Sequence, residues 1–191
     1  MEPTASPEPA KQFPFTDVDK GSWYYPNVYY VWDNGIMDGM EKDLFAPDGT
    51  TTRAQFAMVI YRMAGSPDAS GLRCPFTDLT ANWYKDAVTW CYNNGVVNGT
   101  SATTFDPMSS ITREQMVAML YRYSGDTVKN TDAVKAFSDA TNISEYAVPA
   151  VAWAVQNSIV NGMGDGTFAP QGNSTRAQLA AVLSRYMELK K

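Results

Sequence analysis

The chain has 191 residues, of which 45% are hydrophobic and 13% aromatic, and its formal net charge is −5. This charge argues against a general nucleic-acid binder, because phosphate contacts need a basic surface. The sequence contains no histidine, which excludes Ser-His and Cys-His catalytic pairs and imidazole metal sites. Two cysteines, Cys74 and Cys91, are too few for a metal cage. We therefore expect neither a metal ion nor a cofactor.

Residues 1–12 are acidic and rich in proline, and they lack the basic and apolar regions of a signal peptide. They predict a linker, so we expect the chain to be a piece of a larger protein or a mature product. The longest uncharged apolar stretches fall well short of a membrane span, and we expect no membrane insertion.

From residue 13 onward one sequence unit occurs three times, over 13–65, 74–125 and 135–189. Each copy opens with a Phe-x-Asp segment, whose aspartates are Asp17, Asp78 and Asp139. An aromatic residue follows at an equivalent position in every copy, at Trp23, Trp83 and Tyr146.

An apolar set with helical spacing comes next in each copy and predicts a first helix. The set is Val28, Val31 and Trp32, then Val88, Cys91 and Tyr92, then Val151, Ala154 and Val155. Where this helix should end in a left-handed residue, the copies have Gly35, Gly95 and Ser158. Because Cys91 lies on the apolar face, we expect it to be a small core residue. A Cys74–Cys91 disulfide is the alternative.

A glycine-containing link, followed by Phe-x-Pro, joins the first helix to a second one and predicts turns or a two-residue β-bridge. Its glycines include Gly39, Gly99 and Gly162. The second helix has apolar residues at offsets 0, 3, 4 and 7, which is a strong amphipathic pattern. They are Phe56, Val59, Ile60 and Met63, then Met116, Met119, Leu120 and Tyr123, then Leu179, Val182, Leu183 and Tyr186.

A helix-loop-helix unit of about 50 residues buries its own apolar stripe poorly, because small units leave too much surface exposed. We therefore predict a mainly α fold in which the three repeats form one cooperative domain. Its pseudo-threefold axis would run through a shared central helical bundle. An open solenoid is the alternative packing.

The second helix begins with Thr-Arg-x-Gln in all three copies, which fits the capping box. The threonine and glutamine pairs are Thr52 with Gln55, Thr112 with Gln115, and Thr175 with Gln178. Losing such a cap typically costs about 1 kcal/mol. These two residues therefore have a sufficient structural explanation.

The arginine of this motif, at Arg53, Arg113 and Arg176, lacks such an explanation. A cation in the first helical turn opposes the macrodipole by roughly 0.3–1 kcal/mol. One explanation is an ion pair with the aspartate of a Phe-x-Asp segment. The other is an anion site, in which the guanidinium and free helix amides converge on a carboxylate or phosphate. The arginines alone leave both open.

The other recurrent side chains favour a sugar ligand. An aromatic ring can cover the apolar C–H face of a sugar, while a nearby carboxylate accepts hydrogen bonds from its hydroxyl groups. The alternative is that the rings of Trp23, Trp83 and Tyr146 cover the hydrophobic interior. The joint recurrence of aspartate, aromatic and arginine in three copies favours the sugar.

The order of these motifs resembles the S-layer homology domain over about residues 13–189. The resemblance implies a three-pronged spindle around a central helical bundle. It also implies a non-catalytic, extracellular module that attaches an exported protein to the bacterial cell wall. The implied partner is a secondary cell-wall polysaccharide, often carrying pyruvylated amino sugars, bound in grooves between adjacent motifs. We expect the isolated domain to be a monomer.

By position, the ligand-contacting residues of that family fall on equivalent residues of the three copies. They are Asp17, Trp23, Gly39 and Arg53; Asp78, Trp83, Gly99 and Arg113; and Asp139, Tyr146, Gly162 and Arg176. Glutamine replaces the family's glutamate in every Thr-Arg-x-Gln motif, which keeps the cap but removes a charge. Tyr146 and Ser158 replace the family's tryptophan and glycine, so the third copy departs most from the pattern.

Two other functions remain alternatives. The recurrent arginines could engage an acidic protein partner. A glycoside hydrolase would use two carboxylates, although the recurrent acidic residues occur once per unit and not as a facing pair.

Overall fold

The computed structural model describes residues 12–191, and this range is mainly helical, as predicted. The α-helices are α1 (Tyr25–Asp33), α2 (Arg53–Met63), α3 (Asn82–Asn93), α4 (Arg113–Ser124), α5 (Val148–Gln156) and α6 (Arg176–Leu189). Three short 3-10 helices precede α5, namely η1 (Asp132–Ala136), η2 (Ala140–Asn142) and η3 (Glu145–Ala147). Apart from Gln12, the linker predicted for residues 1–12 lies outside the described residues.

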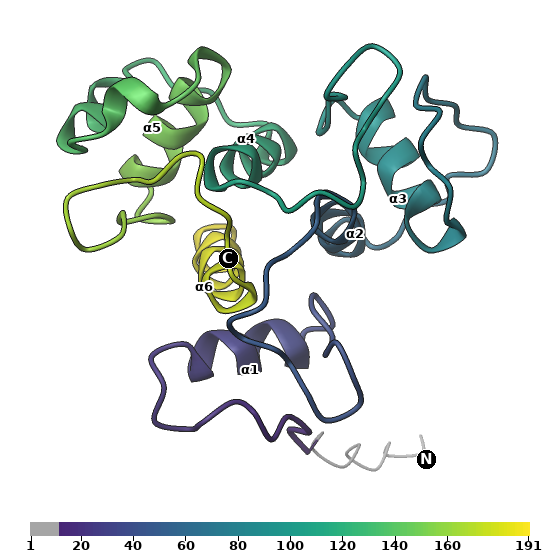
Figure 1. Ribbon diagram of the computed structural model, residues 1–191, viewed down its shortest axis with the longest axis horizontal. Helices are drawn as coiled ribbons and strands as arrows, with labels where there is room; N and C mark the ends of the chain where they lie inside the picture. The colour runs from purple at the N-terminus through teal and green to yellow at the C-terminus, as the bar shows by residue number, and fades with distance from the viewer. Residues whose placement is uncertain (1–11) are drawn as a thin grey trace, which may run out of the picture.

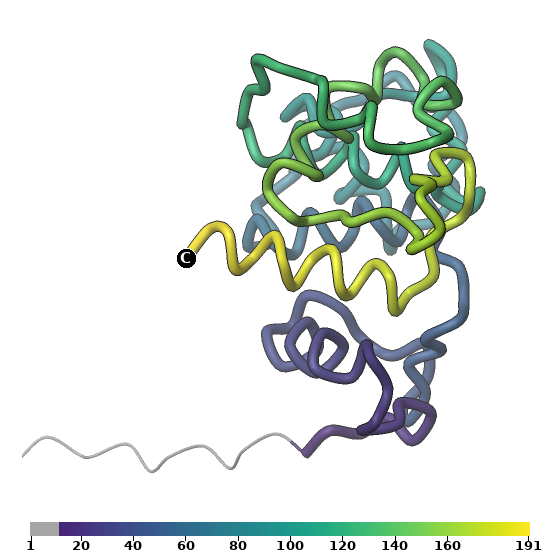
Figure 2. The backbone as a smooth tube through the Cα atoms, turned by 90° about the vertical axis from the view of Figure 1, so that its left-hand side faces the viewer, coloured from purple at the N-terminus to yellow at the C-terminus, as the bar shows by residue number. Residues whose placement is uncertain are grey.

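The second helices of the repeats lie inside and the first helices outside. Figure 1 shows α2, α4 and α6 nearly end-on around the centre, with α1, α3 and α5 in three outer lobes. Each outer helix packs against an inner helix of another repeat: α3 on α2, α5 on α4, and α1 on α6. The first lobe therefore lies beside the C-terminal helix (Figure 2). This contact between the first and last repeats closes a ring, which differs from the open solenoid alternative.

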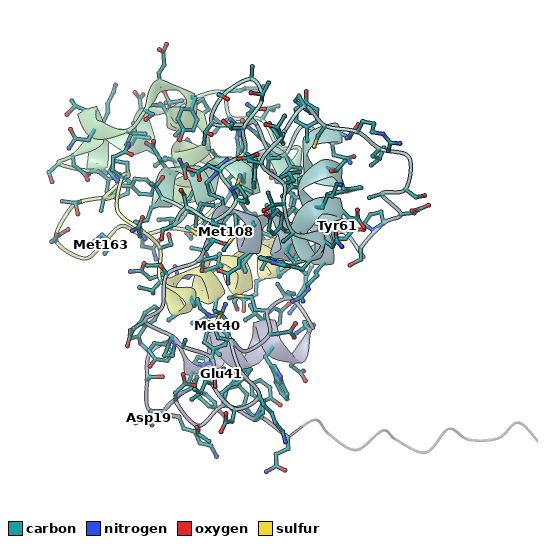
Figure 3. All side chains as sticks on the ribbon, turned by 45° about the vertical axis from the view of Figure 1, so that its right-hand side comes forward. Asp19, Met40, Glu41, Tyr61, Met108 and Met163 are labelled. Carbon is teal, nitrogen blue, oxygen red and sulfur yellow. The ribbon has the colours of Figure 1, made fainter. Side chains whose placement is uncertain are left out.

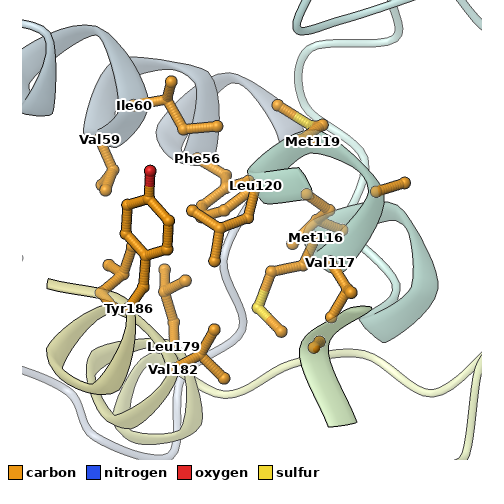
Figure 4. Packing of buried hydrophobic residues seen from close by; sticks show 14 of the residues in the cluster. Phe56, Val59, Ile60, Met116, Val117, Met119, Leu120, Leu179, Val182 and Tyr186 are labelled. Atoms are coloured by element: carbon orange, nitrogen blue, oxygen red, sulfur yellow. The ribbon is translucent and has the colours of Figure 1, made fainter. Parts of the chain in front are cut away.

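The apolar faces predicted for the second helices form the core between them. Phe56, Leu120 and Leu179, one from each inner helix, are fully buried and converge in Figure 4. Burying a side chain of this kind stabilises a fold by roughly 1.5–3 kcal/mol. The pattern underestimated the burial, since the small neighbours Ala57, Val117 and Ala180 are buried as well. The inner helices are covered on more than one side because the shared core lies between them and each also packs against an outer helix.

The ends predicted for the first helices are confirmed. Gly35, Gly95 and Ser158 are left-handed, with φ of 66°, 70° and 56°. One residue of the predicted apolar face, Tyr92, is 38% exposed. It lies at the edge of the core, where its ring packs edge-on against Phe76 with the centroids 5.2 Å apart.

Cys74 and Cys91 are free thiols, and no disulfide joins them. Cys91 is fully buried in the core, as predicted, and burial raises the pKa of its thiol to about 12. A buried thiol with so high a pKa is inert at neutral pH.

We propose that the three repeats unfold as one unit, because the outer helix of each repeat is covered by the inner helix of another. Denaturant unfolding followed by tryptophan fluorescence and by far-UV circular dichroism should give one coincident transition. Replacing the buried Val28 of α1 with alanine should move that whole transition to lower denaturant concentration. Two separate transitions, with only one affected by Val28→Ala, would contradict the proposal.

Candidate functional site

The three inner helices begin with the predicted capping box. In α2 the amide of Gln55 donates to Thr52 Oγ1 at 3.2 Å, and the amide of Thr52 donates to Gln55 Oε1 at 2.9 Å. The equivalent distances in α4 and α6 are 3.2 to 3.3 Å. Because Oε1 faces the threonine amide, the Nε2 group of each glutamine is free of the cap.

The next two amides of each inner helix donate to another repeat. In α2 the amides of Arg53 and Ala54 donate to the carbonyl oxygens of Ser109 and Pro107, at 3.0 and 2.9 Å. The equivalent acceptors are Gly172 and Pro170 for α4, and Gly49 and Pro47 for α6. This corrects the expectation of free helix amides at an anion site, since their partners are carbonyl groups of the protein.

Isolated β-bridges accompany these hydrogen bonds and join the segments just before the inner helices. They are Thr50–Thr175, Thr52–Ser110 and Thr112–Asn173. The predicted bridge was placed earlier, inside the glycine-containing link. The observed bridges connect different repeats, so each pair of repeats is joined next to the start of an inner helix.

Each motif arginine extends from its own helix onto a phenylalanine of another repeat. Arg53 Nε donates to the Phe105 carbonyl at 2.9 Å, and its guanidinium lies 4.6 Å from the centroid of the Phe105 ring. Arg113 and Arg176 make the same two contacts with Phe168 and Phe45. The carbonyl group and the ring face stabilise the cation that the macrodipole disfavours.

The alternative of an ion pair between these arginines and the repeated aspartates is wrong. Among residues 12–191 the ion pairs join other residues. The carboxylate of Asp17 instead accepts hydrogen bonds from the amides of Phe45 and Ala46 at 2.8 and 2.7 Å. Asp78 and Asp139 accept the equivalent amides in their own copies.

These carboxylates hold a strained turn. The residue after each phenylalanine is left-handed, with φ of 57° at Ala46, 59° at Asp106 and 54° at Ala169. A non-glycine residue in such a conformation costs of order 1–3 kcal/mol. The aspartate offsets this cost by binding the two amides of the turn. It therefore acts on the arginine indirectly, by positioning the phenylalanine that the guanidinium contacts.

Three surface grooves lie beside the motif arginines, and each combines parts of all three repeats. Groove 1 is formed by 37–40, α2, Arg176 and Trp83. Groove 2 is formed by 98–100, α4, Arg53 and Tyr146. Groove 3 is formed by 160–163, α6, Arg113 and Trp23. Their volumes are about 370, 410 and 220 Å³. The first two lie at the lower end of the roughly 300–1,000 Å³ range of ligand sites, and the third is below it. Each groove therefore suits a small unit such as one sugar residue.

The grooves bring together three of the four residue types that the sequence indicated. The recurrent aromatics line them and are exposed, by 61% for Trp23, 48% for Trp83 and 50% for Tyr146. These exposures contradict the alternative that the rings cover the interior. The arginines and glycines also line the grooves, whereas Asp17, Asp78 and Asp139 do not.

The groove glycines are required by packing within the protein. A Cβ atom on Gly99 would lie 2.6 Å from a ring carbon of Phe76, and one on Gly39 would lie 2.7 Å from the Leu44 carbonyl oxygen. Both distances are too short for a real contact. Glycine at these positions therefore lets the groove loop lie directly on the phenylalanine of the Phe-x-Asp segment.

A second arginine in each groove was missed in the sequence. Arg62, Arg122 and Arg185 line grooves 1, 2 and 3, nine residues after the first arginine of the same helix. The signal in the sequence was the constant spacing of nine residues between the two arginines in all three copies. A cation near a helix C-terminus is favourable in itself, which explains Arg62 and Arg122 in the last turns of α2 and α4. It does not explain Arg185, because α6 continues past it to Leu189.

Glu114 is a further residue that the sequence did not indicate. It is 2% exposed and accepts hydrogen bonds from the Ser144 amide, the Ser144 hydroxyl and the Tyr146 hydroxyl, at 2.9, 2.7 and 3.0 Å. Burial, followed by the charge of Glu114, raises the pKa of Tyr146 to about 12. The tyrosine of groove 2 is thus a fixed, neutral ring.

The motif arginines of the grooves are charged at neutral pH. Burial lowers the pKa of Arg176 to about 10, an effect that Asp17 and Asp38 counteract. Burial also lowers the pKa of Arg53 and Arg113. An arginine with a pKa near 10 is still charged at pH 7. The guanidinium groups are therefore only partly solvated cations, the state in which a carboxylate ligand is held most strongly.

The family model of the S-layer homology domain matches residues 14–57, 75–117 and 136–180, one match for each repeat. The matches cover more than half of the chain, and the chain belongs to this family.

Several relatives share the repeats. The chain is 35% identical to an endoglucanase of Bacillus sp. (strain KSM-635) over 175 residues, which are 90% of the chain and 18% of the endoglucanase. It is 26% identical to the S-layer protein sap of Bacillus anthracis over 181 residues, which are 94% of the chain and 22% of that protein. It is also 26% identical to a cellulosome-anchoring protein of Acetivibrio thermocellus over 112 residues, covering 56% of the chain and 25% of that protein. The chain thus spans a quarter or less of each of these relatives.

Between residues 12 and 191, none of the helices has both the length and the apolar character needed to cross a membrane.

The role of the repeated aspartates can be tested through the pH dependence of stability. Burial alone would raise the pKa of Asp78, but the amides of Phe105 and Asp106 outweigh it and hold the pKa below the ordinary 3.8. A pKa that is lower in the folded state means that the ionised carboxylate stabilises the fold above about pH 4 and that this contribution is lost as the pH falls further. Asp78→Asn should lower the free energy of unfolding at pH 7 and reduce the additional loss at pH 3. Urea unfolding at both pH values measures this, and an equal acid loss in both proteins would contradict it.

Proposed function

We propose that this chain is a non-catalytic anchoring module that holds its parent protein at the bacterial cell surface. It does so by binding an anionic secondary cell-wall polysaccharide in the grooves between repeats. Membership of the S-layer homology family supports the anchoring role, as does similarity to an S-layer protein and a cellulosome-anchoring protein.

The observation that carries the proposal is the shared content of the three grooves. Each has two guanidinium groups and one exposed aromatic ring. The ring suits the apolar face of a sugar, and the guanidinium groups suit a carboxylate attached to it. A pyruvyl ketal is such a group, because it fixes a carboxylate rigidly on a sugar ring. A rigid anion loses little freedom when two arginines bind it.

The content of the grooves favours binding over hydrolysis. A glycoside hydrolase needs two carboxyl groups, roughly 5 to 10 Å apart, beside the scissile bond. Groove 1 is lined by one carboxylate, Asp38, whereas the described lining of grooves 2 and 3 contains none. The similarity to enzymes supports no catalytic role, because it covers only a small share of the endoglucanase.

The structural role of the motif arginines changes how they should be tested. If these arginines served binding alone, Arg53→Ala or Arg113→Ala would weaken polymer binding and leave the fold nearly intact. Each of these side chains also joins two repeats through a phenylalanine carbonyl and ring. Alanine would remove both roles together, so an exposed groove residue gives a cleaner test.

Cosedimentation with purified cell-wall sacculi tests the proposed function. Binding should persist after proteins are removed from the sacculi and disappear after the secondary polymer is extracted. A soluble pyruvylated saccharide should compete for binding better than its ketal-free counterpart. Binding that depended on wall proteins would instead support a protein-interaction module.

Trp23→Ala should weaken binding to protein-free sacculi that retain the secondary polymer by about tenfold, equivalent to about 1.4 kcal/mol, because it removes the ring of groove 3. The unfolding midpoint should change little, since the side chain is 61% exposed. Met108→Ala is a matched control, because Met108 is 63% exposed and lines none of the three grooves. Equal effects of the two substitutions would contradict a role for the groove.

A further inference from the structure

The three grooves differ at one loop position that precedes the groove glycine. It holds Asp38 in groove 1, Asn98 in groove 2 and Asn161 in groove 3. The arginines, the glutamine and the glycine are the same in all three grooves. The charge of this one residue is therefore the main electrostatic difference among them.

In groove 1, Asp38 engages both arginines. Its carboxylate pairs with Arg62, with 2.8 Å between Oδ2 and Nη1. Its backbone carbonyl accepts a hydrogen bond from Arg176 Nη2 at 2.6 Å. Groove 1 thus already contains a counter-ion on Arg62, and the backbone of the same residue occupies a donor of Arg176.

The equivalent contacts weaken in the other grooves. In groove 2 the Asn98 carbonyl lies 3.4 Å from Arg53 Nη2. In groove 3, among the described residues, the hydrogen bond of the Arg113 side chain is the one that Nε donates to Phe168. The terminal nitrogens of Arg113 are therefore the least engaged of the three motif arginines, although the residue is only 4% exposed.

The second arginine is also less compensated in groove 3 than in groove 1. Arg185 in groove 3 donates to the Ile159 carbonyl at 3.2 Å, a neutral partner that leaves its charge uncompensated. Arg62 in groove 1 is paired with a carboxylate. Groove 2 is intermediate, because Asn98 is neutral and its carbonyl lies 3.4 Å from Arg53 Nη2. Two carboxylates, Asp106 and Asp78, also act on Arg53, whereas one, Asp139, acts on Arg113.

We propose that groove 3 is the strongest site for the carboxylate of the ligand, and that Asp38 makes groove 1 the weakest by occupying the position of that carboxylate. This inference rests on the proposed function, since it concerns the same grooves. An incoming anion in groove 1 must displace Asp38 from Arg62 or remain beside a like charge. Groove 3 presents two arginines and a tryptophan to the same ligand, and its described lining residues include no carboxylate.

The walls of groove 1 are consistent with a less charged occupant. Met40, Met58 and Val59 line it beside Trp83. Figure 3 shows Met40 of groove 1 and Met163 of groove 3 on loops of two different lobes. Because Val160, Met163 and Val182 give groove 3 apolar walls as well, the ion pair of Asp38 with Arg62 is the feature that distinguishes groove 1. With that charge already paired, groove 1 should take an uncharged sugar of the polymer more readily than grooves 2 and 3 do.

Tryptophan indole signals can report two grooves separately, because Trp83 lines groove 1 and Trp23 lines groove 3. In a titration with a defined pyruvylated saccharide followed by NMR, the Trp23 signal should shift with a midpoint about tenfold lower than that of Trp83, a difference that one nearby charge can produce. The ketal-free saccharide should weaken the response of Trp23 more than that of Trp83. Trp23→Phe and Trp83→Phe assign the two signals.

Asp38→Asn should lower the midpoint of Trp83 several-fold toward that of Trp23 and leave the Trp23 midpoint unchanged. Asp33→Asn is the matched control, because it makes the same charge change at an exposed residue outside the three grooves. Equal midpoints in the unmodified protein, or an Asp38→Asn protein that titrates like the control, would overturn the inference and leave the anchoring function standing. If neither indole signal responds to the saccharide, the proposed function fails and the inference fails with it.

Discussion

The fold depends on how the first turn of each inner helix is satisfied. The capping box uses residues of the same repeat, but the next two amides and the arginine side chain donate to carbonyl groups of another repeat. A buried amide or guanidinium group without a partner costs far more than its hydrogen bond contributes. No repeat can therefore complete its own inner helix. The requirement runs from the first repeat to the second, from the second to the third, and from the third back to the first.

The contacts between repeats at the start of each inner helix also shape the grooves. The aspartate of each repeat fixes a strained turn, the turn presents a phenylalanine, and the phenylalanine carbonyl and ring hold an arginine of another repeat. One edge of that guanidinium belongs to the core, while its terminal nitrogens face the groove. A ligand at this edge would meet a cation whose position has been set before binding, which reduces the entropic cost of association. The structural role and the proposed binding role would then reside in different atoms of the same side chain.

Much of this could be predicted from the sequence, because local patterns determine it. Capping boxes, helix faces and left-handed stops depend on neighbouring residues, and all of these are found. The partner of each aspartate could not be predicted. Asp17 binds an amide 28 residues away, and nothing in the sequence distinguishes such a carboxylate from one that pairs with an arginine. The second arginine was not predicted because a favourable charge near a helix C-terminus accounts for Arg62 and Arg122, and the sequence does not show that α6 continues past Arg185. Its position in a groove became apparent only when three repeats were placed together.

Because of the cyclic arrangement, the residues of one repeat line different grooves. Tyr146 of the third repeat lines groove 2, where Glu114 of the second repeat fixes its hydroxyl group. Groove 3 combines the loop of the third repeat with Arg113 of the second and Trp23 of the first. The departures noted in the third repeat therefore do not accumulate in one site. Each groove takes its loop, its first arginine and its aromatic ring from three different repeats. A single loop residue, such as the aspartate at position 38 where the other grooves have asparagine, can therefore alter one groove without disturbing the contacts between repeats.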